Sequence, residues 1–278
     1  MWSSSRTDLG EYTCAKISVM DHTGRAIIVT GAASGIGRAA TQIILDAGGS
    51  VVAVDRDADA FDWVNANEPG SERLVTMGGD VSQIETNEAA VAAALEHFGR
   101  LDACVLNAGV SSSGDLVDQP IEQFERALAV NVTAVILGVR AATPAIRESS
   151  DSGAFCVTAS TSGLGGDPNM WSYNTTKGAV VNYVRSAALD LGPMGIRINA
   201  VAPGPTETGM TSRIQELPEI HESLRQRMAL KRWGQPEEIG QVISFLVSPL
   251  ASIVTGAIVP ADGGMSASTG QFLPNPLP

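Results

Sequence analysis

The sequence predicts an α/β fold in which one doubly wound parallel sheet carries helices on both faces. Short β-branched runs alternate with longer stretches of helical period along nearly the whole chain, and each run is almost continuously apolar. Parallel strands covered on both faces have this continuous pattern, whereas half-exposed strands alternate. A chain of 278 residues is long enough for one such domain, and no linker or internal repeat divides it.

Seven runs are predicted to be strands because each is short, apolar and rich in β-branched residues. They are residues 26–30, 51–55, 74–78, 103–107, 154–159, 197–202 and 257–261. Right-handed crossovers between successive strands would bring them into one sheet. We therefore expect a single domain over 25–264, preceded by an N-terminal extension (1–24) and followed by a C-terminal tail (265–278).

Five stretches between these runs predict the main helices. They are residues 36–48, 83–99, 121–148, 171–192 and 236–248. In the first, an apolar stripe runs from Ala40 to Ala47 and two glycines end the helix. The fourth is apolar nearly all round, which predicts burial against the sheet and against a second subunit.

Composition narrows the classes of function. An apolar fraction of 44% with 17% charged residues is typical of a globular protein. The formal net charge of -12 argues against nucleic acids and anionic membranes as partners. There is no uninterrupted apolar stretch of about 18 residues to predict a membrane span, and the first residues lack the apolar core of a secretory signal. We expect a cytoplasmic protein.

Cysteines and histidines give little sign of a metal site. Cys104 and Cys156 lie inside apolar runs, which predicts buried, reduced thiols. No Cys-x-x-Cys or histidine-rich spacing is present, so we expect no metal. His22, His97 and His221 lie in polar or helix-end contexts and are expected to be solvated.

A glycine-rich turn predicts a dinucleotide site. Gly31, Gly35 and Gly37 stand between the first predicted strand and the first predicted helix. Such glycines let the backbone approach a pyrophosphate at the helix N-terminus. Asp55 ends the next strand, 18 residues after Gly37, near the ~20 expected for the carboxylate that binds the ribose hydroxyls. Asp55 would repel the 2′-phosphate of NADP, which favours NAD as the cofactor. The positive charge of Arg56 could bind that phosphate, so NADP remains an alternative.

The stretch "YNTTK" places a phenol and an ammonium one helical turn apart. Tyr173 and Lys177 then share a helix face, which is also what a surface helix with a casual contact would show. Hydride transfer at a carbonyl carbon needs a proton carrier at its oxygen, and beside a nicotinamide site Tyr173 fits that role. We expect the Lys177 ammonium, with the positive nicotinamide ring nearby, to lower the pKa of Tyr173.

Ser160 and Asn131 are the remaining candidates. Ser160 follows the fifth predicted strand, thirteen residues before Tyr173, at the sheet edge where ligands bind. Its hydroxyl would stabilise charge that develops on the substrate oxygen. The hydroxyls that compete for this role are Thr158, Thr161 and Ser162. Asn131 interrupts an apolar helix, where a buried amide needs partners and can be purely structural.

Together these motifs resemble the short-chain dehydrogenase/reductase family. The resemblance lies in "TGAASGIG" from Thr30 to Gly37, in "NAG" from Asn107 to Gly109 and in Tyr173-x-x-x-Lys177, and it covers about 25–264. It implies a Rossmann-type sheet of seven parallel strands in the order 3-2-1-4-5-6-7. It also implies a homotetramer built on helices at 116–148 and 172–191 and on the last strand.

The resemblance also implies roles for individual residues. The catalytic set is Asn131, Ser160, Tyr173 and Lys177, with Asn131 holding a water that leads from Lys177 toward solvent. The cofactor set is Gly31, Ser34, Gly35, Ile36, Gly37, Asp55, Asp80, Val81, Asn107, Ala108, Gly109, Tyr173, Lys177, Pro203, Gly204, Thr206 and Thr208. Within it, Asp80 would bind the adenine amine and Val81 would pack on its ring. Thr206 stands where the family more often has Val or Ile.

The sequence thus predicts an NAD-dependent oxidoreductase acting on a secondary alcohol or its ketone. The segment 212–228 is expected to be the substrate lid, facing 163–171 and 110–113. An apolar or cyclic substrate is indicated by the side chains expected in the cleft, which are Leu164, Met170, Trp171 and Met210. The alternatives are an NADPH-dependent 3-oxoacyl-carrier-protein reductase and a catalytically silent dinucleotide-binding regulator. We expect residues 1–19 to be dispensable for folding and activity.

Overall fold

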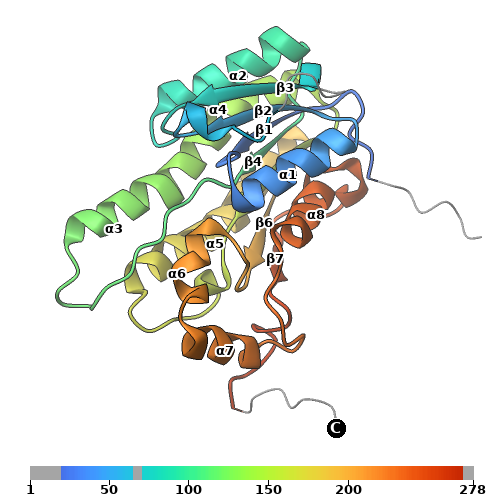
Figure 1. Cartoon of the computed structure of the whole chain (residues 1–278). Helices are drawn as coiled ribbons and strands as arrows, with labels where there is room; N and C mark the ends of the chain where they lie inside the picture. The colour runs from blue at the N-terminus through green and yellow to red at the C-terminus, as the bar shows by residue number, and fades with distance from the viewer. Residues whose placement is uncertain (1–19, 65–70, 272–278) are drawn as a thin grey trace, which may run out of the picture.

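In the computed structural model, which describes residues 20–64 and 71–271, seven parallel strands form one sheet in the order β3-β2-β1-β4-β5-β6-β7 (Figure 1). The strands are β1 (Ala26–Thr30), β2 (Ser50–Asp55), β3 (Leu74–Gly78), β4 (Ala103–Leu106), β5 (Gly153–Thr158), β6 (Ile196–Pro203) and β7 (Ile258–Ala261). The predicted fold, strand number and strand order are confirmed, and each boundary lies within one residue of its prediction. The extension at 1–19, and with it Cys14, lies outside the described residues.

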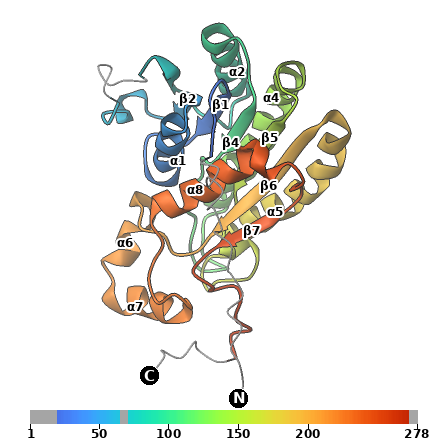
Figure 2. The ribbon, with the colours of Figure 1, turned by 90° about the vertical axis from the view of Figure 1, so that its right-hand side faces the viewer.

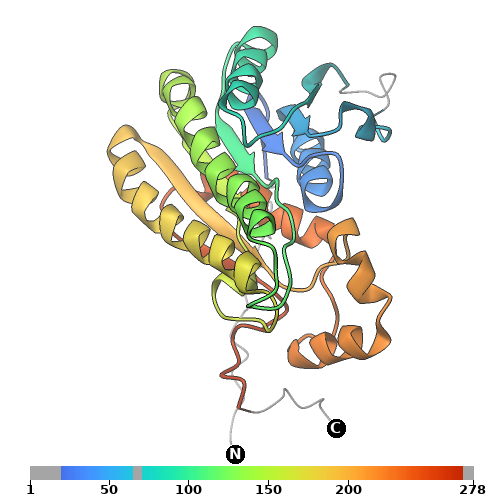
Figure 3. The ribbon, with the colours of Figure 1, turned by 90° about the vertical axis from the view of Figure 1, so that its left-hand side faces the viewer.

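Helices cover both faces of the sheet. The long ones are α1 (Gly35–Asp46), α2 (Ile84–Phe98), α4 (Ala134–Ser149), α5 (Trp171–Leu191) and α8 (Pro236–Val247). Figure 2 shows α1 and α8 together on one side, and Figure 3 shows α2, α4 and α5 side by side on the other. Two short helices, α6 (Ser212–Gln215) and α7 (Pro218–Arg227), stand apart from these layers, beyond one end of the sheet.

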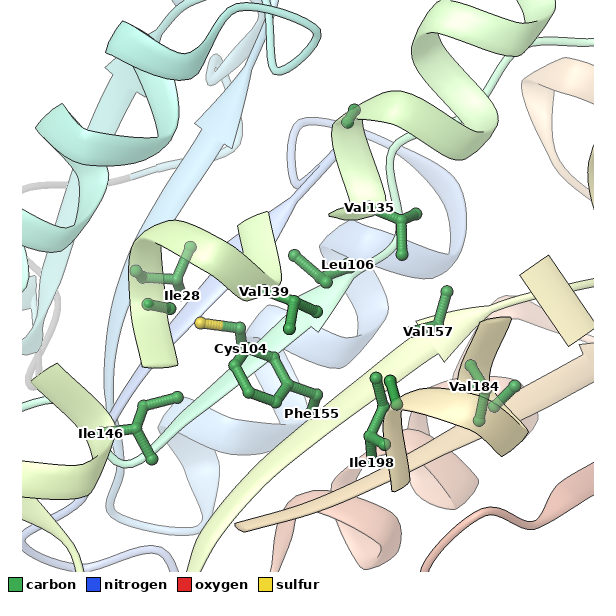
Figure 4. Packing of buried hydrophobic residues seen from close by; sticks show 14 of the residues in the cluster. Ile28, Cys104, Leu106, Val135, Val139, Ile146, Phe155, Val157, Val184 and Ile198 are labelled. Atoms are coloured by element: carbon green, nitrogen blue, oxygen red, sulfur yellow. The ribbon is translucent and has the colours of Figure 1, made fainter. Parts of the chain in front are cut away.

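Two apolar layers, one on each face, form the core. In the first, Phe155 and Ile198 of the sheet pack with Val139 of α4 and Val184 of α5 (Figure 4). The second layer joins the opposite face to α1 and α8. Full burial of such side chains contributes about 1.5–3 kcal/mol each.

The two described cysteines point to opposite layers of this core and are unpaired. Burial raises the pKa of the Cys156 thiol to about 12, and it raises that of Cys104 further still. Both thiols therefore stay protonated and unreactive. The prediction of buried, reduced cysteines is confirmed for Cys104 and Cys156.

One continuous helix runs from 121 to 149 and changes its winding in the middle. It consists of α3 (Ile121–Leu128), a π-helical segment (Ala129–Thr133) and α4. It is long enough to cross a membrane, with 29 residues and a window of 18 residues whose mean hydropathy is 1.5, although Asn131 and Arg140 interrupt its apolar run. Its buried side chains pack onto the sheet, and the core helix of a soluble protein passes the same test.

The expectation that all three histidines are solvated is wrong for His22. Its side chain is 0% exposed, its backbone N–H donates to the Ala47 carbonyl at 2.8 Å, and its Nε2 lies 2.9 Å from Ser244 Oγ. Ser244 belongs to α8 and is 222 residues away, so polar neighbours in the sequence gave no sign of it. His221 is half-buried and stacks on Trp233 at 4.6 Å between ring centroids, whereas His97 is exposed.

His22 makes stability depend on pH. Burial, with repulsion from Arg25, lowers its pKa from 6.5 to about 4. As the pH falls, the unfolded chain binds a proton at His22 before the folded chain does. The contribution of neutral His22 to the free energy of unfolding is therefore complete above pH 6.5 and is lost as the pH falls toward 4, a loss of about 3 kcal/mol. We expect His22→Gln, which cannot titrate, to show a shallower fall of Tm between pH 6.5 and 4.5. His97→Gln is the exposed control, and equal slopes for both variants and the wild-type protein would contradict this prediction.

Candidate active site

A chain of polar contacts joins the carboxyl ends of β1, β4 and β5. Thr30 Oγ1 accepts hydrogen bonds from the backbone N–H groups of Asn107 (3.0 Å) and Ala108 (3.1 Å). The Asn107 amide donates to the carbonyls of Thr30 (3.1 Å) and Gly31 (3.3 Å). It also accepts a hydrogen bond from Thr158 Oγ1 at 3.0 Å. Three neighbouring strand ends are thereby held in one arrangement.

The glycine turn lies directly against this chain. A Cβ at Gly37 would stand 2.0 Å from the Gly31 carbonyl oxygen and 2.6 Å from Asn107 Nδ2, so no larger residue fits there. Gly31 and Gly35 have positive φ angles of 65° and 52°. Ser34, at the start of α1, makes no capping hydrogen bond through its side chain. The first N–H groups of α1 are therefore left for an anion, which fits the pyrophosphate of a dinucleotide.

Asp55 and Asp80 stand at the next strand ends. One Asp55 oxygen accepts from the backbone N–H of Ala33 (3.0 Å) and the other from that of Arg56 (2.8 Å). Asp80 accepts from the N–H and the hydroxyl of Ser82, and these two bonds lower its pKa. Asp55 is thus fixed beside the glycine turn, where a ribose hydroxyl of a dinucleotide would lie.

A cleft of about 970 Å³ runs across these strand ends. All the residues predicted to bind the cofactor line it except Gly37, which lies buried behind the turn. Ser160, Tyr173 and Lys177 of the predicted catalytic set line it as well, whereas Asn131 lies behind its wall. The structure therefore brings the predicted cofactor and catalytic residues into one cavity.

Lys177 is buried at the floor of the cleft. It is 4% exposed, its Nζ donates to the Thr158 carbonyl at 2.8 Å, and it lies 5.7 Å from the centroid of the Tyr173 ring. Burial lowers the pKa of Lys177 to about 8. The ammonium therefore loses its proton more readily than that of an ordinary lysine.

The groups of the chain itself raise the pKa of Tyr173, and the lowering expected when the positive nicotinamide ring is also present stays a prediction. Burial raises the pKa of the Tyr173 phenol, and the charge of Asp167 raises it further, against a hydrogen bond from Ser160 that lowers it. Desolvation of the phenolate is the largest cause of this shift. Without other charges in the cleft, Tyr173 is a neutral acid at pH 7.

Ser160 is the hydroxyl close enough to Tyr173 to lower the pKa of the phenol. Its Oγ also accepts from the backbone N–H of Ser162 at 3.1 Å, which fixes its direction. Two of its rivals are engaged elsewhere, Thr158 with Asn107 and Ser162 with Asp167. The geometry therefore favours Ser160 for contact with a substrate oxygen.

Asn131 lies in the π-helical segment and is 1% exposed. Its amide accepts from the Val110 N–H (2.8 Å) and donates to the Val110 carbonyl (3.0 Å) and to Thr176 Oγ1 (3.0 Å). These bonds give hydrogen-bond partners to both polar atoms of the Asn131 amide, as a purely structural role requires. A Cβ at Gly109 would lie 3.2 Å from Asn131 Oδ1 and 3.6 Å from Lys177 Nζ, so the glycine keeps a gap between those two side chains. A water relay there stays a prediction.

Thr206 and Thr208 mainly stabilise their own loop. Thr206 is 3% exposed and its hydroxyl donates to the Gly204 carbonyl at 2.9 Å. Thr208 caps the short helix Gly209–Thr211. Both still line the cleft, and a Cβ at Gly35 would meet the Thr208 side chain at 3.4 Å, so this loop closes over the glycine turn.

The opposite end of the cleft is covered by the predicted lid and is lined by apolar side chains together with Glu219, Ser223 and Arg227. Its apolar lining is Val110, Met170, Met210, Ile214, Ile220, Leu224, Trp233 and Met265. Sequence reasoning missed Ile214, Ile220 and Leu224, although the spacing of the last two predicts one helix face. These side chains face the cavity from α6 and α7.

Two side chains that were expected in the cleft do not line it. Leu164 is 40% exposed, outside the cavity. Trp171 packs on Phe124 with ring centroids 5.4 Å apart, and its Nε1 donates to the Asp115 carbonyl at 3.4 Å. Trp171 precedes Tyr173 by two positions, about 200° around the helix, so the two side chains leave on different faces. That prediction is wrong for Leu164 and Trp171.

Comparison with known proteins points the same way. The family model described as Enoyl-(Acyl carrier protein) reductase matches residues 31–266. The chain is 37% identical to the meso-2,3-butanediol dehydrogenase of Serratia marcescens, over 91% of this chain and 98% of that protein. It is 35% identical to the 2-(R)-hydroxypropyl-CoM dehydrogenase of Xanthobacter autotrophicus, over 87% and 99% respectively.

Solved structures of related proteins resemble this fold closely. A short-chain type dehydrogenase/reductase from Mycobacterium marinum superposes with a TM-score of 0.83 at 30% identity, over 90% of this chain and 98% of that one. Levodione reductase superposes with a TM-score of 0.79 at 32% identity, over 88% of this chain and 99% of that one. The likeness extends over nearly the whole of both proteins.

Proposed function

Since the chain belongs to the short-chain dehydrogenase/reductase family, whose members are hydride-transfer oxidoreductases, we propose that it is an NAD-dependent oxidoreductase of an apolar or cyclic secondary alcohol and its ketone. One observation carries the proposal. Tyr173 and Ser160 line the same cleft as the glycine turn, with Lys177 buried one helical turn away. The apolar lining beneath the lid supports the substrate class.

The side chains of the cleft divide the work at the substrate oxygen. Bound NAD would accept the hydride from the alcohol carbon. Ser160 would hydrogen-bond the substrate oxygen, and Tyr173 would take its proton during oxidation or return it during reduction. Lys177, whose Nζ is already held by the Thr158 carbonyl, would orient the ribose next to the nicotinamide. Because the pKa of Tyr173 is raised, we infer that oxidation gains rate as the pH rises.

Asp55 supports NAD over NADP. Its carboxylate is fixed beside the glycine turn by two backbone N–H groups, where it would accept hydrogen bonds from the ribose hydroxyls and repel a 2′-phosphate. Arg56 lines the same part of the cleft and is the observation that favours an NADPH-dependent 3-oxoacyl-carrier-protein reductase. A catalytically silent regulator would have no need for the Ser160–Tyr173 pair.

We expect Tyr173→Phe to abolish turnover while NADH still binds. The variant keeps the ring and removes the group that carries the proton, so the loss should be at least about 10²- to 10⁴-fold, the usual contribution of general acid–base catalysis. The measurements are NAD reduction with a panel of secondary alcohols, and NADH fluorescence for binding. Near-normal turnover in the variant would refute this mechanism, and binding without any turnover by the wild-type protein would favour the regulator.

We expect Asp55→Ala to lower kcat/KM with NAD and to raise kcat/KM with NADP. The change removes both a ribose contact and a repulsion, so the ratio of kcat/KM for NAD over NADP should fall by about tenfold or more. Arg56→Ala is the matched variant and should change only kcat/KM with NADP. A wild-type protein that prefers NADP would show that Arg56, rather than Asp55, decides the choice.

Assembly as a cytoplasmic homotetramer is a further part of the proposal. The helix 121–149 and α5 lie side by side on one face, where Leu128 is 36% and Leu189 is 78% exposed (Figure 3). Packing this face against a second copy would bury both side chains. We expect light scattering at micromolar concentration to give about 115 kDa, four times the 28.8 kDa of one chain. A mass of one chain would contradict it.

A further inference from the structure

Asp167 is a carboxylate in the substrate half of the cleft that the reaction described above does not use. It lines the cavity together with Tyr173 and Ser160, and it belongs to the loop that joins β5 to α5. Ser162 Oγ donates to its Oδ2 at 2.6 Å. Among the hydrogen bonds of the described residues, Oδ1 has no partner, so one oxygen remains for a ligand.

The loop around Asp167 is held in place rather than free to swing. The Asp167 carbonyl accepts from the Met170 N–H at 3.3 Å, and the Asn169 carbonyl accepts from the Gly114 N–H at 2.9 Å. Asn169 itself has a left-handed backbone with φ of 58°. The loop backbone is therefore fixed, and the exposed Asp167 carboxylate is oriented by its hydrogen bond from Ser162.

The charges around the substrate position are few. Tyr173 faces Lys177 on its own helix and Asp167 on the preceding loop, while α7 brings Glu219 and Arg227 to the cleft from the lid. Asp167 is near enough to Tyr173 for its charge to raise the pKa of the phenol. An anionic substrate group next to the reacting carbon would meet this carboxylate and be repelled. A hydroxyl there would instead donate a hydrogen bond to it.

We infer that Asp167 is a specificity-determining residue that selects neutral diols and polyols by accepting a hydrogen bond from a second hydroxyl next to the reacting carbon. This rests on the proposed function. In the reaction, the hydride leaves the carbinol carbon with two electrons for NAD, and the proton of the same carbinol goes to Tyr173. The second hydroxyl stays intact on Asp167, so the product is a hydroxyketone.

One known relative is named for a substrate of this class. Its name contains meso-2,3-butanediol, a neutral diol with hydroxyls on adjacent carbons. The apolar lining from Met170, Ile214 and Leu224 would contact the carbon skeleton of such a substrate. Asp167 and Glu219 are the carboxylates at this end of the cleft, and a hydrogen bond to Asp167 would distinguish a diol from the corresponding mono-alcohol.

The test compares kcat/KM for meso-2,3-butanediol and for 2-butanol at saturating NAD. We expect Asp167→Ala to lower the diol-to-mono-alcohol ratio by about tenfold or more, the size of a hydrogen bond to a charged group. Asp190→Asn, at the exposed far end of α5, is the control and should keep the wild-type ratio. A ratio unchanged in Asp167→Ala, or an equal loss for both alcohols, would overturn the inference.

A second readout separates specificity from a merely structural role. In Asp167→Asn the negative charge beside Tyr173 is gone, so the pKa of the phenol should fall. The acid limb of the pH profile of kcat/KM for 2-butanol oxidation should then move to lower pH, with Asp190→Asn unchanged. An unmoved limb would count against the placement of Asp167 beside the phenol. If the wild-type protein oxidises no alcohol of the panel with NAD or NADP, the proposed function fails. Activity toward the panel with an unchanged diol-to-mono-alcohol ratio in Asp167→Ala refutes only the role of Asp167.

Discussion

The hydrogen-bonded chain from Thr30 through Asn107 and Thr158 to Lys177 is the contact on which the rest of the site depends. It ties the ends of β1, β4 and β5 to α5, and every link joins residues at least 19 positions apart. The glycine turn packs on one end of it, because a Cβ at Gly37 would strike Asn107. At the other end it fixes Lys177. Cofactor placement and proton chemistry therefore share a single polar scaffold within a buried sheet.

Burial decides the electrostatics of this scaffold. The pKa of Lys177 falls to about 8 and that of Tyr173 rises, because each charged form is separated from water. Both shifts favour neutral side chains, the opposite of an ammonium–phenolate pair. The chain alone therefore holds a resting acid, and Ser160 is the one uncharged group that counteracts the rise. A positive ring brought beside the phenol would shift the balance toward the phenolate, which couples proton transfer to cofactor binding.

The fold could be predicted from the sequence because its strands are continuous apolar runs that burial on both faces demands. The glycine turn and Tyr173-x-x-x-Lys177 were equally visible, since a close backbone approach and a shared helix face depend on local spacing. What failed depends on long-range packing. His22 finds Ser244 from 222 residues away, and Trp171 turns to Phe124 rather than to the cleft. Asp167 lay within the expected cleft loop, but nothing in its spacing marked it.

The lid is clamped at its base, which separates substrate choice from the cofactor machinery. The Gly234 N–H donates to the Pro205 carbonyl and the Glu207 N–H donates to the Gly234 carbonyl, both at 2.9 Å. These two bonds close the segment that carries α6 and α7 into a loop whose ends lie together. Ile220 and Leu224 lie within this loop, far in the sequence from β6 and the glycine turn. A site built this way can change its substrate while Asp55, Tyr173 and Lys177 keep their positions.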